Sequence, residues 1–445
     1  MSVWIKNPLS ILATDAGGGI VVEGGKIVEL VATGTVPKLL VNETYDASQH
    51  VVLPGLINTH HHFYQTLTRA CPQAINKELF PWLKSLYPIW AGLNPDNFRL
   101  AVRVALAELL LSGCTTASDH HYVFPKSLTD GVDIEVDEVQ KMGLRGHLTR
   151  GSMNLSIEDG GLPPKSVTQS ADIILADSER VINQFHERGP GAMIEIALAP
   201  CSPFSVTPEL MRDTAALAAK LDVRLHTHLA ETNNENDFCQ TVHGCRPLEY
   251  LDRVGWLTDR TWLAHGIHFT PGEMTQLGKS GVGIAHCPSS NYMLASGHCQ
   301  IKELEAENVA VGLAVDGSAS SDCSNMIQEV RQAFFLQRLH YGASKVTHID
   351  AINWATKGSA KILGRDDIGE IALGKQADFA LFKMDELRFS GAGDPLAALV
   401  LCGAHRADRV MVAGQWRVID GEIPGLDIPA LMQAHQIEAI KLQAT

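Results

Sequence analysis

The sequence is short of charge and contains no long run of Lys and Arg. Charged residues make up 19% of the 445 positions, below the usual quarter, whereas 45% are hydrophobic. Such a chain can bury a sizeable core, so general disorder is excluded. The balance of 36 Lys+Arg against 50 Asp+Glu gives a net charge of −14. This acidic background argues against nucleic acid as a partner.

Signals for membrane insertion or secretion are also missing. No stretch of 18 or more uncharged apolar residues occurs, and the first residues lack a basic segment followed by an apolar one. We therefore expect a cytoplasmic protein without a membrane partner. The nine cysteines are an odd number and are never spaced Cys-x-x-Cys. This pattern disfavours a disulfide framework and a Cys-rich zinc site, and indicates reduced thiols.

Short apolar runs alternate with helical patterns through the middle of the chain. No repeat of 20–50 residues accompanies them, which disfavours a solenoid. Eight runs are expected to be buried strands: Leu56–His60, Cys114–Asp119, Leu144–Arg150, Met193–Ala199, Val223–His228, Trp262–His265, Val282–Ala285 and Gly312–Asp316. Helical spacing is found in five segments: Asn97–Leu111, Ala171–His186, Pro208–Leu221, Pro247–Val254 and Cys323–Tyr341. Eight strands alternating with helices predict a parallel barrel.

The two ends of the chain differ from this middle part. Short β-like runs separated by glycine fill the first fifty residues, and the same texture returns near the C-terminus. The predicted fold is therefore α/β, a (β/α)8 TIM barrel over residues 55–371. Residues 1–54 and 372–445 are expected to form one small discontinuous β-sandwich domain, followed by a helix from about Pro429.

Histidine and aspartate residues stand where several predicted barrel strands end. In a TIM barrel these ends form the active site. His60 and His62 alternate along one strand, so both can point inward and clamp a metal. A third imidazole from strand five and a carboxylate from strand eight would complete an N3O set that suits catalytic zinc, and a water on zinc becomes a nucleophile. The candidates are His226 or His228 on strand five, His265 on strand six and Asp316 on strand eight.

Four segments resemble the amidohydrolase superfamily, in its branch of guanine, cytosine and S-adenosylhomocysteine deaminases and chlorohydrolases. They are residues 54–62, 225–232, 263–266 and 314–317, within a resemblance that extends over essentially the whole chain. More narrowly, residues 60–69, 86–90 and 118–124 are similar to 8-oxoguanine deaminases and to hydroxydechloroatrazine ethylaminohydrolase. The resemblance implies a metal-dependent aminohydrolase acting on cyclic amidines.

The resemblance also assigns roles to individual residues. The family's His-x-x-Glu pattern selects His228 over His226, because Glu231 follows His228 at that spacing. Segment 197–202 lacks the bridging lysine of binuclear relatives, which implies one Zn²⁺ per chain. The His-x-Glu and Pro-Cys-x-x-Cys signature of cytidine-deaminase-type enzymes is missing. Metal binding falls to His60, His62, His228 and Asp316, and catalysis to Glu231, His265 and Asp316.

The expected reaction is hydrolytic loss of ammonia from an aminated purine, with 8-oxoguanine, which would give urate, as the first choice. Asp316 would accept a proton from the water, Glu231 would protonate the ring, and His265 would stabilise the developing charge. Gln65, Arg150 and Cys201 are the candidate substrate-binding residues, although each also has a structural interpretation: a surface glutamine, an ion-paired arginine and a packed thiol.

Three alternatives remain at this point. The same attack could remove an alkylamino group from a hydroxylated s-triazine, or the substrate could be guanine or another aminoheterocycle. A noncatalytic, metal-stabilised binding protein belongs to a different class. Glu231 and His265 beside an incomplete metal shell argue against it. The resemblance further implies a homo-oligomer whose other partner is a small heterocyclic substrate.

Overall fold

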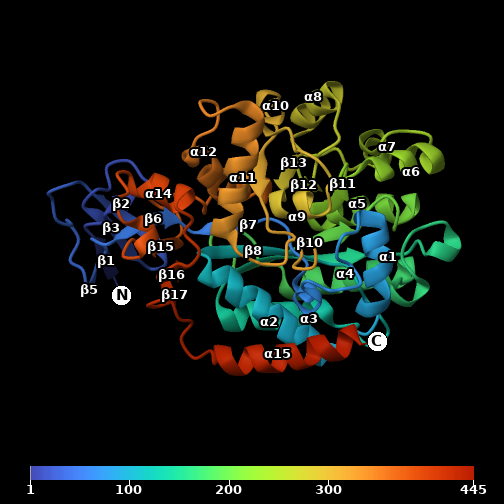
Figure 1. Cartoon of the computed structure of the whole chain (residues 1–445), viewed down its shortest axis with the longest axis horizontal. Coiled ribbons are helices and arrows are strands. Elements are labelled where there is room, and N and C mark those ends of the chain that lie inside the picture. The colour runs from blue at the N-terminus through green and yellow to red at the C-terminus, as the bar shows by residue number, and fades with distance from the viewer. Residues whose placement is uncertain (1, 445) are drawn as a thin grey trace.

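A parallel eight-stranded sheet, rolled into a nearly closed barrel, forms the centre of the computed structural model, which describes residues 2–444 (Figure 1). Each strand pairs in parallel with the next one along the chain. The Thr59 amide donates to the Leu313 carbonyl at 3.2 Å, which links the ends of the first and last strands. The strands are β7 Leu56–Asn58, β8 Cys114–His121, β9 Arg145–Ser152, β10 Ile194–Pro200, β11 Leu225–Leu229, β12 Thr261–His265, β13 Gly283–His286 and β14 Val311–Leu313. The predicted fold class is confirmed.

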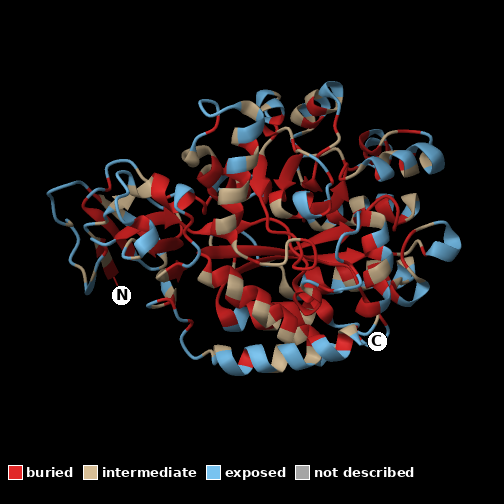
Figure 2. Cartoon of the chain, viewed as in Figure 1, coloured by how far each residue is buried: buried red, intermediate tan, exposed pale blue. Residues whose placement is uncertain are grey.

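Helices surround this barrel, and the strands inside are almost wholly buried (Figure 2). Burial on both faces explains why the strands appear in the sequence as short apolar runs rather than as alternating patterns. All five predicted helical segments are helices. The connecting helices are α2 Pro95–Leu111, α3 Gly131–Met142, α4 Ala171–Phe185, α5 Pro208–Leu221, α6 Asn233–His243, α7 Pro247–Arg253, α8 Pro271–Ser280, α9 Pro288–Met293, α10 Ile301–Ala306, α11 Met326–Tyr341, α12 His348–Asn353 and α13 Ser359–Ile362, with a π-helical turn at Trp354–Gly358.

Helix α1, Leu79–Trp90, was not among the predicted helices. It contains Pro88, and proline inside a helix removes a backbone hydrogen bond, so local propensity argues against this assignment. Burial of its apolar face compensates. Four short 3₁₀ turns complete the connections: η1 Phe63–Thr68, η2 Ile157–Asp159, η3 Lys165–Val167 and η5 Leu387–Phe389.

Two further sheets lie beside the barrel, at the left of Figure 1. One contains only N-terminal strands, in the order β4-β3-β1-β5, and the other joins both ends of the chain in the order β17-β16-β15-β6-β2. The boundaries at residues 54/55 and 371/372 stay a prediction. The strands are β1 Ser2–Lys6, β2 Ser10–Ile11, β3 Gly19–Glu23, β4 Lys26–Val31, β5 Glu43–Asp46, β6 His50–Pro54, β15 Phe379–Lys383, β16 Arg409–Val412 and β17 Gln415–Val418, with α14 at Pro395–Leu401.

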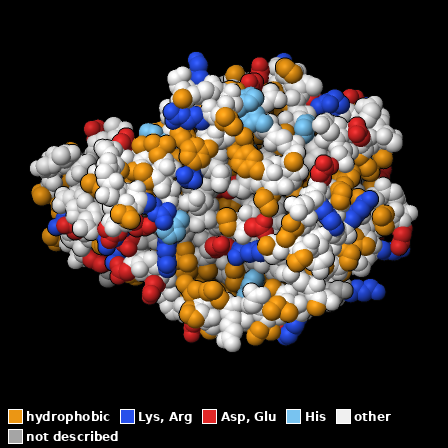
Figure 3. Space-filling view, viewed as in Figure 1, with side chains coloured by type: hydrophobic (Ala, Val, Ile, Leu, Met, Phe, Trp, Pro, Cys, Tyr) orange, Lys and Arg blue, Asp and Glu red, His pale blue; other side chains and the backbone are white. Residues whose placement is uncertain are grey.

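The C-terminal helix α15, Ile428–Gln443, begins one residue before the predicted start and runs beneath α2 (Figure 1). Its His435 lies 3.0 Å from the Thr66 hydroxyl, and its Gln443 amide donates to the Leu67 carbonyl at 2.7 Å. The helix thus supports η1, which directly follows His62. None of the helices within residues 2–444 is long and apolar enough to cross a membrane. Acidic and basic side chains are interspersed over the face shown in Figure 3.

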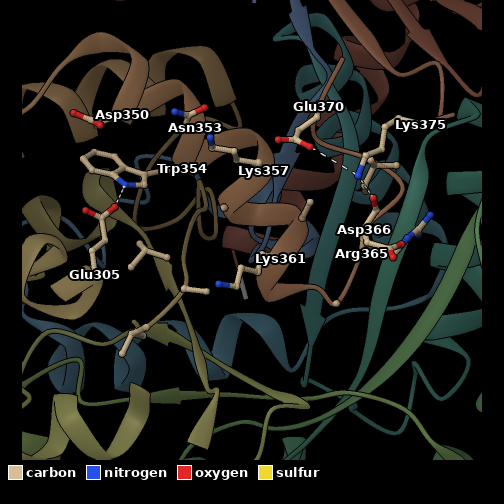
Figure 4. A pocket seen from close by; sticks show the side chains of 17 residues that line it. Glu305, Asp350, Asn353, Trp354, Lys357, Lys361, Arg365, Asp366, Glu370 and Lys375 are labelled. Carbon is tan, nitrogen blue, oxygen red and sulfur yellow. Dashed lines mark hydrogen bonds and ion pairs between the residues drawn. The ribbon is translucent and has the colours of Figure 1, made fainter. Parts of the chain in front are cut away.

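A hollow of about 680 Å³ opens beside the π-helical turn and the start of β14. Lys375, Asp366 and Glu370 are in contact on one side of it, and the Trp354 indole donates to Glu305 on the other (Figure 4). None of the predicted site residues lines this hollow. Its lining includes both lysines and carboxylates, so no single ligand charge is favoured.

Candidate active site

Four nitrogen and oxygen atoms converge at the carboxyl ends of the barrel strands. Asp316 Oδ1 lies 3.3 Å from His60 Nε2 and 3.4 Å from His62 Nε2, while His62 Nε2 lies 3.2 Å from His228 Nε2. A tetrahedral zinc site with bonds of 2.0–2.1 Å has donor atoms about 3.3–3.4 Å apart. These three spacings fit a small divalent cation. His60, His62 and His228 form one group of donors within 4.8 Å of one another, and Asp316 forms a second group with His60 and His265.

Hydrogen bonds behind the imidazoles leave each Nε2 free to bind a cation. The Nδ1 atoms of His62 and His228 donate to the carbonyls of His120 and Cys201, at 2.8 and 2.7 Å. His60 Nδ1 lies 2.7 Å from His226 Nε2. His226 Nδ1 must donate to the Trp262 carbonyl at 2.9 Å, because that oxygen can only accept, so His226 Nε2 in turn accepts from His60.

The electrostatics of this cluster also fit a cation. Burial lowers the pKa of all three imidazoles, that of His228 to about 3, so they are neutral and their Nε2 lone pairs face one another. His60 Nε2 is buried and has no hydrogen-bond partner among residues 2–444. Neutral imidazoles and a carboxylate are the ligands that bind zinc. Burial opposes ionisation of Asp316, yet its contacts with His60 and with His265, whose own pKa is raised, hold the pKa of Asp316 well below the usual range.

His265 and Asp316 both adopt left-handed backbone conformations, with φ of 71° and 62°. Such conformations are costly for residues with a side chain, and they cluster at functional sites. His265 Nε2 lies 3.6 Å from Glu231 and 3.8 Å from Asp316. Burial alone would lower the pKa of His265, but these two carboxylates raise it. The Asn291 side-chain oxygen, 3.0 Å from His265 Nδ1, orients the ring.

Glu231 is buried at the same end of the barrel, and burial raises its pKa to about 7. A second buried carboxylate, Glu235 on α6, accepts hydrogen bonds from the Ala230 and Glu231 amides, both at 3.0 Å. Ala230 has a φ of 55°, so this pair of bonds holds a strained turn. Sequence reasoning missed Glu235, although a carboxylate four residues after Glu231 was a visible signal.

A narrow pocket covers the converging donors, and two of the three predicted substrate-binding residues, Gln65 and Cys201, line it. Gln65 Oε1 accepts from the Ala319 amide at 3.2 Å, which orients the side-chain amide. A Cβ at Gly317 would lie only 2.0 Å from that oxygen, so a larger residue there would displace the Gln65 amide. The thiol of Cys201 is protonated at neutral pH because burial raises its pKa to about 12.

The structure does not bring Arg150, the third predicted substrate-binding residue, into this pocket. Its guanidinium donates to Asp177 at 2.7 Å and to Gln169 at 2.8 Å, and it stacks over the Phe124 ring at 3.8 Å. The alternative reading of Arg150, a structural ion pair, describes these contacts. The pocket instead contains residues that sequence reasoning did not assign to a site, all on α1 except the last two: Leu79, Trp82, Leu83, Tyr87, Phe204 and Leu294.

Comparisons with known proteins agree with this geometry. The model of the Amidohydrolase family matches residues 51–417. The chain belongs to the amidohydrolase family. It is 61% identical to 8-oxoguanine deaminase from Pseudomonas aeruginosa, with 99% of both chains covered. It is also 37% identical to hydroxydechloroatrazine ethylaminohydrolase from a Pseudomonas species, over 86% of this chain and 80% of that one.

A solved structure extends the comparison to the fold. Atrazine chlorohydrolase from Arthrobacter aurescens, determined in complex with zinc, superposes with a TM-score of 0.92 at 30% identity and covers 99% of this chain and 100% of its own. This amidohydrolase chain is therefore a metal-dependent hydrolase, as the sequence predicted.

Proposed function

We propose that the chain hydrolyses 8-oxoguanine to urate and ammonia with one Zn²⁺ held by His60, His62, His228 and Asp316. Three close approaches among these donors, of 3.2–3.4 Å, support the proposal of a metal site, together with the grouping of His60 with His62 and His228 and of His60 with Asp316. The substrate rests on the 61% identity to an 8-oxoguanine deaminase over nearly the whole chain. When bound, the zinc supplies Lewis acidity and a water that loses its proton near neutral pH.

The other groups of the site handle protons. Glu231, whose pKa is about 7, can hold a proton at neutral pH and give it to the ring nitrogen beside the reacting carbon. Asp316, whose pKa lies well below its usual range, accepts a proton and returns it to the leaving amine. His265, in contact with both carboxylates, stabilises the charge that develops on the substrate.

Substrate selection falls to the pocket above these groups. The side-chain amide of Gln65 can donate to a purine edge, because its oxygen is already engaged by Ala319. The Cys201 thiol contributes packing and a weak donor. Arg150 is not part of the proposed substrate contacts, since its donors are directed at Asp177 and Gln169.

The second candidate is removal of an alkylamino group from a hydroxylated s-triazine, favoured by the 37% identity to hydroxydechloroatrazine ethylaminohydrolase. Amine release by zinc-loaded protein should distinguish the candidates when kcat/KM is measured for 8-oxoguanine, guanine and an N-alkylaminotriazine. We expect the highest value with 8-oxoguanine. A higher value with either competitor would contradict the substrate but not the metal site.

Metal content tests the cofactor separately. With four protein donors and no lysine in β10, we expect about one zinc per chain by elemental analysis. Two tightly held metals per chain would contradict the proposed mononuclear site. A small substrate, a cytoplasmic location and a homo-oligomeric state accompany this proposal.

A further inference from the structure

The polar side chains of the pocket differ in whether they already have a partner in the protein. Trp82 Nε1 donates to the Ala319 carbonyl at 3.1 Å, and the Ser320 hydroxyl bonds the Gly317 carbonyl at 3.1 Å. The Tyr87 hydroxyl is fully buried and has no such partner among residues 2–444. Among the described pocket residues, it is the one buried side-chain oxygen or nitrogen without a protein hydrogen-bond partner. A buried hydroxyl left unpaired is costly, so this atom points to a ligand.

Helix α1 aims Tyr87 at the pocket. Leu79, Leu83 and Tyr87 follow one another at intervals of four residues, so they share the face of α1 that lines the pocket. The Tyr87 ring is 99% buried, and its edge-on contact with the Trp90 ring, at 5.8 Å between centroids, fixes its position. The other side chains from this face are apolar. Tyr87 is thus the single free hydrogen-bonding group that α1 offers to a substrate.

A substrate in this pocket would contact both α1 and the strand ends, because residues of both line it. Glu231, His265 and Asp316 come from the strand ends, where the amine-bearing carbon reacts. In a 2-aminopurine skeleton, C8 is the ring carbon farthest from C2, so an oxygen on C8 would be directed away from these groups and toward α1.

We propose that the Tyr87 hydroxyl donates a hydrogen bond to the C8 oxygen of an 8-oxopurine and so determines the preference for oxidised over unmodified purine. This inference rests on the proposed deaminase function. A donor is the required partner for a carbonyl oxygen, and burial keeps the pKa of the Tyr87 phenol well above its usual range, so the proton is present at neutral pH.

A phenol-to-phenylalanine comparison tests the proposal. In zinc-loaded Tyr87→Phe, kcat/KM for 8-oxoguanine should fall on the order of 10- to 100-fold while that for guanine changes little, because only the former loses a buried partner. Tyr250→Phe is the matched control. Its hydroxyl is also buried and has no protein partner among residues 2–444, but it lies on α7 outside the pocket. The ratio of kcat/KM for 8-oxoguanine to kcat/KM for guanine should be the same in Tyr250→Phe as in the unmodified protein.

Binding provides a readout independent of turnover. Urate carries the C8 oxygen and xanthine does not, so Tyr87→Phe should weaken inhibition by urate and leave inhibition by xanthine unchanged. An unchanged 8-oxoguanine to guanine ratio, or an equal fall for both substrates, would overturn the role of Tyr87. If the unmodified protein released no ammonia from either purine, the proposed function itself would fail.

Discussion

Buried carboxyl groups have different surroundings at the two ends of the barrel. At the carboxyl ends of the strands, Glu231, Glu235 and Glu329 are buried without a Lys or Arg partner among the described residues, and burial raises their pKa values to about 7, 7 and 8. At the other end, Asp378 is paired with Arg145 at 2.7 Å, both being buried. Three glutamates at one end are thus kept protonatable by burial, whereas the buried carboxylate at the other end has a guanidinium partner.

The carboxyl groups at one end are suited to proton transfer, and the ion pair at the other end is suited to stabilising the fold. The Arg145 pair joins the start of β9 to the segment before β15, so it fastens the barrel to the sheet that contains both chain ends. The open hollow beside the π-helical turn is also lined by charges in contact with one another (Figure 4). The site candidate is instead the narrower pocket, where carboxyls without a Lys or Arg partner among the described residues lie beside imidazole nitrogens. Chemical environment, rather than cavity size, distinguishes the two ends.

The largest expected effect is at Asp316. Asp316→Asn keeps the shape of the side chain but cannot accept a proton, so kcat should fall on the order of 10³- to 10⁴-fold while the fold is retained. Turnover and zinc content should be measured on the same sample. Activity near that of the unmodified protein, with zinc bound, would contradict the assignment of the reactive end.

At the opposite end, Asp378→Asn should affect stability but not chemistry. Removing one partner of a buried pair leaves the Arg145 charge uncompensated, at a cost of about 3–5 kcal/mol, whereas kcat per folded molecule should not change. Asp222→Asn is the control, since Asp222 makes only exposed ion pairs and should cost less than about 1 kcal/mol. Urea unfolding measures both. If both variants lowered the free energy of unfolding by the same amount, the buried ion pair would stabilise the fold no more than the exposed ones.

Glu231→Gln tests the proposed proton donor at the carboxyl ends of the barrel strands. The amide cannot donate a carboxylic proton, so kcat should decrease about 100-fold or more, with zinc content unchanged because Glu231 is not a proposed ligand. Steady-state kinetics and elemental analysis of the same preparation provide the test. Loss of zinc with unchanged activity per bound metal would make Glu231 a structural residue.

How far the sequence could predict the site depends on how local each signal is. Barrel topology alone indicates that His265 and Asp316, which follow short apolar runs, lie at the strand ends. Strand geometry left His226 and His228 open, and the family's His-x-x-Glu pattern was needed to select His228. His60 and His62 were expected on a strand, but β7 ends at Asn58, so both follow the strand. These residues do converge in the fold.

The orientation of Arg150 could not be predicted from its neighbours in the sequence. Its partner Asp177 lies on α4, 27 residues away, and nothing near Arg150 in the sequence indicates that its guanidinium turns away from the pocket. Helix α1 is a similar case. Its Pro88 argues against a helix in the sequence, whereas burial in the folded protein stabilises one. Without this helix, the position of Tyr87 could not be predicted.

The last expected effect concerns the pH dependence of stability. Glu329 accepts two hydrogen bonds from Ser289, and burial raises its pKa from 4.5 to about 8. The folded state therefore retains a proton that the unfolded state releases above about pH 4.5. This contribution to stability is complete below that pH and is lost as the pH rises toward 8.

Glu329→Gln removes this titration. Between pH 5 and 8, the free energy of unfolding of the unmodified protein should decrease more steeply than that of the variant, by on the order of 1 kcal/mol per pH unit. Urea unfolding at several pH values measures both slopes, with Glu249→Gln, an exposed change on α7, as the control. Parallel curves for Glu329→Gln and the unmodified protein would mean that Glu329 is ionised in the folded state. Glu329 would then not belong to the carboxyls that burial keeps protonatable at this end of the barrel.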